Sequence, residues 1–210
     1  GVSCADCHMP YKQEGGIKYT DHKIGNPLDN MENSCMNCHR VSEKSLLDNI
    51  AEKRARKDEL HEKAMKQLAS AHLEAGHAWK VGATKAEMAP ILTDIRHAQW
   101  RWDYAVASHP AFFHAPEETL RVLATALEKA GNARIKLAKV LAKHGASDYV
   151  APALTSKKVA QEITGLPFEK LVNEKKKFQN GLLNEWKKEA EKKGIYNPES
   201  TKNIVDKTSY

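Results

Sequence analysis

The chain has 210 residues, of which 41% are hydrophobic and 7% aromatic, and its formal net charge is +6. This length is enough to bury a substantial core, and the sequence has no run of eighteen consecutive apolar residues that would predict a membrane-spanning helix. A basic balance is compatible with nucleic-acid binding, but both signs of charge are mixed along the predicted helices and are not gathered beside aromatic residues. We therefore expect a solvated helical surface and no nucleic-acid partner.

The first forty residues show little hydrophobic periodicity and contain Pro10, Gly15, Gly16, Gly25 and Pro27. Frequent glycine and proline are typical of loops and short helices. We predict a loop-rich segment here, and we expect no strand of useful length anywhere in the chain.

All four cysteines fall in two copies of one pattern, CADCH and CMNCH, which begin thirty-one residues apart. Two thiols three residues apart can add to the two vinyl groups of one porphyrin, and the histidine that follows can coordinate its iron. The sequence therefore predicts two covalently attached c-type haems. Their attachment residues are Cys4, Cys7 and His8 for one haem, and Cys35, Cys38 and His39 for the other.

A structural zinc site is the main alternative, because two Cys-x-x-Cys pairs supply four thiolates for a tetrahedral ion. Zinc needs neither histidine, whereas haem attachment uses both, so haem explains more of the pattern. Disulfide bonds are the remaining use for four cysteines. Because haem attachment through thioethers is normally completed after export, the haem interpretation also predicts a periplasmic protein.

The pattern changes to long helices near residue 41, so we divide the chain into a dihaem attachment segment, 1–40, and a long-helix region, 41–210. A charged helix is predicted from Ser42 to about Lys80, with apolar residues at helical spacing. A second helix is predicted to begin at Thr84, because Glu87 three residues later completes a capping box. Five of its apolar residues are expected to share one face: Met88, Ile91, Leu92, Ile95 and Trp102.

The third predicted helix begins at Pro116, because proline fits the first turn of a helix and the acidic residues after it favour the positive end. Its apolar residues recur with alternating spacings of three and four, interrupted at Arg134 and ended by Gly145. They are Leu120, Leu123, Leu127, Ala130, Leu137 and Leu141. A short helix near 156–164 and a very basic helix from Pro167 to Lys193, ended by Gly194, are also expected. The predicted fold class is mainly α.

The ten histidines include candidates for the second axial ligands that electron-transfer haems usually have. His22 lies in the turn-rich loop between the two motifs. His114 lies beside two phenylalanines just before a proline-started helix, but His109 shares that loop and periodicity does not separate the two. The histidines inside the predicted helices are expected to be hydrogen-bonded or exposed: His61, His72, His77 and His97.

The sequence resembles the C-terminal part of the pentahaem cytochrome c nitrite reductases. The resemblance is carried, in this order, by CADCHMP, YTDHKIGNP, CMNCH, GATKAEM, DIRHAQWRWD and ASHPAFFHAPEE, and it is weakest after about Gly145. Enzymes of that family reduce nitrite to ammonium with six electrons, at a haem whose attachment motif ends in lysine. Bis-histidine haems relay the electrons to it. No Cys-x-x-Cys-Lys occurs in this sequence.

The resemblance implies a role for each site residue. The motif ending in His8 would hold the family's fourth haem, and the motif ending in His39 would hold the fifth. His114 would be the distal ligand of the fourth haem, and His22 would reach the second haem, which is attached elsewhere. The distal ligand of the fifth haem, the substrate-contacting residues and a calcium site would belong to sequence upstream of Gly1.

The resemblance also implies partners. The long helices would form a homodimer interface, the missing N-terminal part of the enzyme would carry the catalytic haem, and a periplasmic or membrane-anchored cytochrome would donate electrons. We expect this chain to relay electrons and build the dimer, and to be inactive by itself. Two other interpretations stay open: a freestanding dihaem electron-transfer cytochrome, and a zinc-stabilised helical module without a redox role.

Overall fold

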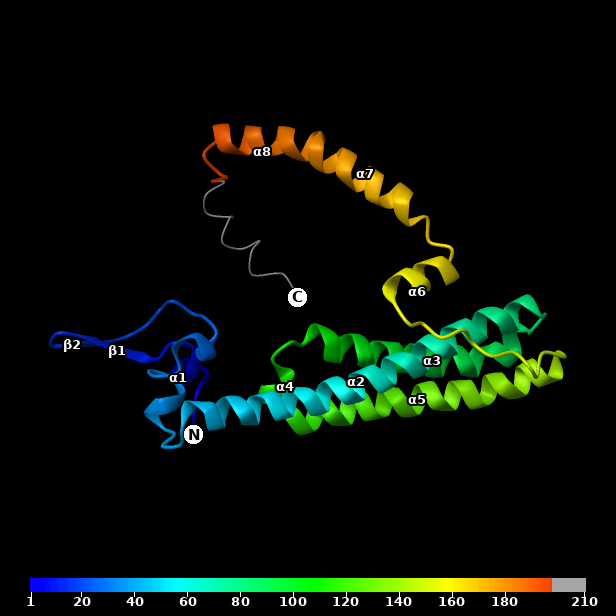
Figure 1. The fold of residues 1–210 in the computed structure, drawn as a ribbon, viewed down its shortest axis with the longest axis horizontal. Helices are drawn as coiled ribbons and strands as arrows, with labels where there is room; N and C mark the ends of the chain where they lie inside the picture. Colours follow the sequence, from blue (N-terminus) through cyan, green and yellow to red (C-terminus); the bar gives the residue numbers. More distant parts are fainter. Residues whose placement is uncertain (198–210) are drawn as a thin grey trace. The chain divides into compact units, whose positions relative to one another are not determined.

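The computed structural model describes residues 1–197, and its architecture is mainly α-helical, as predicted (Figure 1). The predicted long-helix region, 41–210, therefore extends at its end beyond the described residues. The chain divides into two compact units, one over Gly1–Pro152 and one that begins at Ala153. Among the described helices, none is both long enough and apolar enough to cross a membrane.

The first unit begins with short elements and continues with long helices (Figure 1). Its short elements are α1 (Cys4–His8), β1 (Tyr11–Glu14), β2 (Ile17–Thr20) and the 3-10 turns η1 (Pro27–Asn30) and η2 (Cys35–Asn37). Its remaining helices are α2 (Glu43–Lys80), α3 (Lys85–Ala107), α4 (Ala111–His114) and α5 (Pro116–Lys143). The second unit contains α6 (Lys157–Ile163), α7 (Phe168–Asn180) and α8 (Leu182–Lys192).

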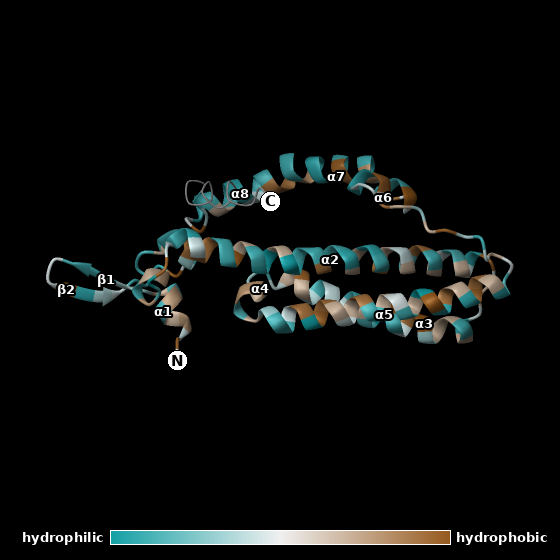
Figure 2. Cartoon of the chain, turned by 60° about the horizontal axis from the view of Figure 1, so that its bottom comes forward, coloured by the Kyte–Doolittle hydropathy of each residue, from teal (hydrophilic) through white to brown (hydrophobic). Residues whose placement is uncertain are grey.

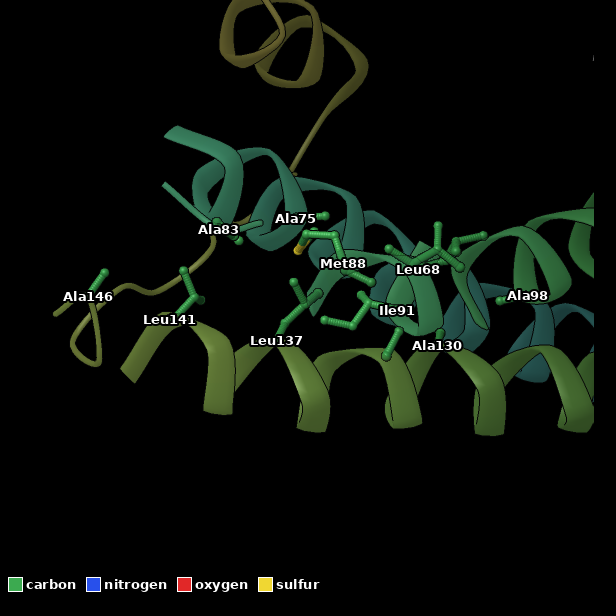
Figure 3. Packing of buried hydrophobic residues seen from close by; sticks show 14 residues of the cluster. Leu68, Ala75, Ala83, Met88, Ile91, Ala98, Ala130, Leu137, Leu141 and Ala146 are labelled. Atoms are coloured by element: carbon green, nitrogen blue, oxygen red, sulfur yellow. The ribbon is translucent and has the colours of Figure 1, made fainter. Parts of the chain in front are cut away.

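The core of the first unit lies where α2, α3 and α5 pack against one another (Figure 3). Many of its buried positions are alanine, from Ala71 on α2 to Ala133 on α5. Small side chains let helix backbones approach closely, and the larger ones fill the space that remains. Met88, Ile91 and Leu137 are among the fully buried large side chains.

The predicted apolar seam of α5 is confirmed in part: Leu123, Ala130, Leu137 and Leu141 are buried, whereas Leu120 and Leu127 are only half-buried. Arg134, which interrupts the seam, bonds across to α2: its Nε and Nη2 donate to the carboxylate of Glu74, and its Nη1 donates to Gln67. Glu74 is only 8% exposed. The interruption in the apolar pattern is therefore a charged contact between two helices.

The prediction that the chain has no useful strand is wrong. Strands β1 and β2 form an antiparallel hairpin in which Tyr11 is opposite Thr20 and Glu14 is opposite Ile17. Gly15 closes the turn with φ of +61°, a conformation that glycine adopts readily. Because most of the side chains are exposed on both faces, the strands lack the alternation of apolar and polar residues that identifies a half-buried strand.

Two helix predictions also need correction. Leu92 is 39% exposed, since it lies off the buried stripe formed by Met88, Ile91 and Ile95. The predicted helix from Pro167 to Lys193 is two helices, α7 and α8, separated at Gly181. A Cβ atom at this position would lie only 3.0 Å from the carbonyl oxygen of Lys177. Glycine, which has no Cβ atom, therefore fits the backbone at this break.

The predicted capping box of α3 is confirmed, and it also joins α3 to the end of α5. The Glu87 carboxylate accepts hydrogen bonds from the Thr84 backbone N–H at 2.8 Å, from Lys143 Nζ and from His144 Nε2 at 3.1 Å. The Lys143 ammonium has the largest effect, and with the Thr84 and His144 donors it holds the pKa of Glu87 well below its usual value of 4.5.

We expect Glu87→Gln to lower the free energy of unfolding at neutral pH, and the difference from wild type to shrink in acid. A carboxyl whose pKa is lower in the folded state stabilises the fold above its unfolded pKa, and this contribution is lost as the pH falls through the folded pKa. The loss therefore begins below about pH 4.5. Thermal unfolding of both proteins across this range tests the prediction, and an unchanged difference from neutral to acid would contradict it.

Candidate haem-binding site

The first motif forms a single helical turn, α1, with a capping box at its start. The Ser3 hydroxyl accepts a hydrogen bond from the Asp6 backbone N–H, and the Asp6 carboxylate accepts one from the Ser3 backbone N–H at 2.7 Å. The Ser3 hydroxyl also donates to this carboxylate, at 2.8 Å, and the backbone N–H and hydroxyl of Ser3 hold the pKa of Asp6 below its ordinary value. Because residues three apart share one face of a helix, this turn directs Cys4 and Cys7 to the same side. That arrangement suits two bonds to one porphyrin.

His8 is oriented by a backbone carbonyl of the loop that follows the hairpin. Its Nδ1 lies 2.9 Å from the carbonyl oxygen of Gly25. Because a carbonyl only accepts hydrogen bonds, the proton must be on Nδ1, and the lone pair on Nε2 is left available for a metal. Metal-ligating histidines usually make this kind of bond through the nitrogen that does not bind the metal.

His114 is the histidine that the structure brings to His8. It ends α4, a short helix that contacts both α2 and α5 (Figure 1). The ring centres of His8 and His114 are 6.1 Å apart and their planes differ by 33°. Two imidazoles on opposite sides of one metal ion, each with a bond of about 2 Å, have ring centres about 6 Å apart. The spacing therefore fits a haem iron held between His8 and His114, with Cys4 and Cys7 as its covalent anchors.

The second motif forms a tight turn, η2, that continues into its histidine. The backbone N–H groups of Cys38 and His39 both donate to the carbonyl oxygen of Cys35, at 3.2 and 2.9 Å. The turn is preceded by Ser34, which is buried and whose hydroxyl bonds to the carbonyl oxygen of Pro27 at 2.9 Å. A buried serine thus fixes the start of this motif, and the two backbone bonds close the turn between its cysteines.

The thiol of Cys7 is affected by its burial and by the second motif. Burial raises the pKa of the Cys7 thiol, and Cys35 of the second motif raises it further. All four cysteines are free, so the disulfide alternative has no support. Across residues 1–197, no three or more histidine, cysteine, aspartate or glutamate side chains are grouped as ligands of a metal ion. The donor set that the zinc alternative requires is therefore not assembled in this part of the chain.

His22 and His39 are exposed and differ from His8 in their surroundings. His22 Nδ1 donates to the carbonyl oxygen of Thr20 at 2.8 Å, which again leaves the lone pair of Nε2 available. The ring contacts of the described residues pair His8 with His114 and include neither His22 nor His39. The assignment of His22 to a haem attached elsewhere stays a prediction.

The histidines inside the long helices have local partners. His72 Nε2 lies 3.2 Å from the side-chain oxygen of Gln99, as the expectation of hydrogen bonding requires. His61 stacks on Trp102 with ring centres 5.1 Å apart, and His77 stacks on Tyr149 at 3.8 Å. Stacking leaves His61 Nε2 buried without a hydrogen-bond partner, so the expectation that this histidine is hydrogen-bonded or exposed is wrong. His97 is exposed, as expected.

Sequence reasoning missed three contributors to the site. One is the carbonyl of Gly25, because any residue could supply it and no sequence signal marks it. The others are Lys53 and Arg54 of α2, whose charged groups lie over the rings of Phe113 and Phe112. Both cations belong to a charged run that predicts only a solvated helix face.

The sequence pattern that defines the cytochrome c552 family matches residues 1–198 of this chain. This chain belongs to the cytochrome c552 family. Its relatives include proteins named cytochrome c-552 from Aliarcobacter butzleri, 73% identical over 209 residues, and from Desulfotalea psychrophila, 54% identical over 210 residues. Each alignment covers 100% of this chain, but 42% and 41% of the relative. The chain therefore spans about two fifths of the length of the curated relatives it matches.

A solved structure of similar fold is cytochrome c nitrite reductase from Desulfovibrio desulfuricans. It is 28% identical, with a TM-score of 0.57, and the match covers 74% of this chain and 33% of that one. The description of that structure concerns two calcium sites of its catalytic subunit. Family and neighbour are both cytochromes c, a class of protein that carries covalently attached haem.

Proposed function

We propose that this chain is the C-terminal part of a periplasmic multihaem nitrite reductase, in which it relays electrons through two covalently attached haems and forms a homodimer. The observation that carries the proposal is the pairing of His8 and His114, with ring centres 6.1 Å apart, beside the thiols of a haem-attachment motif. The family match and the related nitrite reductase support the reaction class that we propose.

Haem c, when bound, supplies an iron centre that exchanges one electron at a time. The residues of this chain determine how that centre behaves. Cys4 and Cys7 would attach the porphyrin covalently, and His8 and His114 would both ligate its iron, so that no position would remain for a substrate. The Gly25 carbonyl orients His8 and increases its basicity as a ligand. Such a site is suited to electron transfer and not to nitrite chemistry.

The reduction of nitrite to ammonium then requires a catalytic haem from another part of the protein. All four cysteines of this chain lie in motifs that end in histidine, so the chain alone is inactive in this proposal. His22 would ligate a haem held by the N-terminal part, the same part would supply calcium and the distal ligand of the His39 haem, and a periplasmic or membrane-anchored cytochrome would deliver electrons.

An absorption spectrum and an intact mass of the exported chain test the proposal directly. We expect a sharp Soret band that shifts on reduction and a mass increased by two covalently bound haems. The variant Cys35→Ser/Cys38→Ser should retain only the first haem. A colourless chain at its bare mass, exported together with the haem-attachment machinery, would overturn the proposal and favour a module without a redox role.

A further inference from the structure

We propose that Lys53 and Arg54 of α2 are positioning residues that hold α4 in place and so keep His114 at its distance from His8. The inference rests on the proposed role of His114 as an axial ligand. It adds two residues, from a helix outside both attachment motifs, that determine how firmly this ligand is held.

A continuous series of contacts joins α2 to the histidine pair. The Lys53 ammonium lies 5.6 Å from the ring centre of Phe113. The Phe113 ring meets the His114 ring edge to face, with ring centres 5.7 Å apart and planes at 74°. His114 in turn lies opposite His8. On the neighbouring ring, the Arg54 guanidinium lies 5.0 Å from the centre of Phe112.

Helix α4 has few means of holding its own position. It is a single turn of four residues, its first residue has no side-chain cap, and none of its residues is buried. A short turn is intrinsically unstable, so its place depends on contacts with other elements. A cavity of ≈ 190 Å³ beside Phe112, lined also by Lys53 and Lys57, shows that close packing does not fill this side. The two cation–π contacts are specific contacts that join α4 to α2.

Other positively charged side chains of α2, close to Lys53 and Arg54 in the sequence, pair with acidic residues. They can therefore serve as controls for the ring contacts of Lys53 and Arg54. Arg56 pairs with Glu52, and Lys57 pairs with Asp58 at 2.8 Å. Among the ion pairs of residues 1–197, none includes Lys53 or Arg54, whose contacts are with the aromatic rings. Replacing Arg56 and Lys57 with neutral residues would therefore remove two positive charges from α2, as replacing Lys53 and Arg54 does, but would remove no contact with an aromatic ring.

The rate at which cyanide replaces His114 on the oxidised, haem-loaded chain tests the proposal, because a filled coordination position must first lose its histidine. We expect a slow binding phase in wild type that is absent in His114→Ala. In Lys53→Met/Arg54→Met this phase should be about tenfold faster, the size expected for two partly exposed cation–π contacts. The charge-matched control Arg56→Met/Lys57→Met should stay within about twofold of wild type.

Two further measurements make the interpretation specific. Lys53→Arg/Arg54→Lys keeps a cation over each ring and should restore the wild-type rate, whereas a general loss of structure would not be rescued in this way. Far-UV circular dichroism should be the same for all variants, because both side chains lie on the surface of α2. If His114→Ala binds cyanide as wild type does, the ligand assignment itself is wrong. If His114→Ala removes the slow phase but Lys53→Met/Arg54→Met leaves its rate unchanged, only the positioning role is wrong.

Discussion

His114→Ala should make the reduced, haem-loaded chain bind one more carbon monoxide molecule than wild type does. Removing the imidazole opens one face of the iron that His8 holds from the other side, because the two rings have the 6.1 Å spacing of a bis-histidine pair. The first haem should change from a low-spin to a high-spin absorption spectrum. Titration with carbon monoxide measures the number of molecules bound by the variant and by wild type. Because the prediction concerns only the difference between these two numbers, it does not depend on how the haem of the second motif is coordinated.

His109→Ala is the matched control for this variant. His109 lies in the same loop, only five residues earlier, and the sequence pattern does not separate it from His114. We expect its replacement to leave the stoichiometry of carbon monoxide unchanged. If His109→Ala gains the extra site and His114→Ala does not, the distal ligand is the other histidine of the loop. If neither variant gains it, the first haem is not held by a histidine pair from this loop.

The parts of the fold that the sequence predicts correctly are those set by local chemistry. Thr84 caps α3 as expected, and Ser42, where α2 is predicted to begin, caps that helix, because a hydroxyl that accepts a bond from a nearby backbone N–H needs only neighbouring residues. Pro116 likewise begins α5 as predicted. The exposed hairpin was missed for the opposite reason, since neither of its faces is buried and no apolar alternation marks it.

The candidate site likewise has one half that the local sequence predicts and one half that it does not. The covalent half is local, because a Cys-x-x-Cys-His motif carries both anchors and one ligand within five residues. The distal half depends on tertiary structure: α4 must be placed by α2 and α5 before His114 can face His8. Periodicity could not choose His114 over His109, and only the family resemblance selected it. The carbonyl of Gly25 has no side-chain identity at all, so the sequence could not mark it.

Arg134 gives the largest expected effect on stability. Its guanidinium makes bonds of 2.9 and 2.7 Å to the Glu74 carboxylate, which is 8% exposed, and a bond of 2.7 Å to Gln67. Arg134→Met would suit the apolar seam, but it would leave the carboxylate buried without a partner. Because Arg134 itself is partly exposed, we expect the lower end of the range for breaking a buried pair, about 3 kcal/mol of unfolding free energy.

Two comparisons separate this effect from a simple loss of charge. Arg121→Met, on the same helix, removes an exposed pair with Glu118 and should lower the free energy of unfolding far less than Arg134→Met does. Arg134→Met/Glu74→Leu removes the buried carboxylate together with its partly exposed partner and should recover most of the stability, because the penalty arises from the unpaired carboxylate and not from the missing arginine. Guanidinium denaturation followed by circular dichroism measures all three. Equal losses for Arg134→Met and Arg121→Met would mean that water reaches Glu74 and that the pair contributes no more than a surface contact.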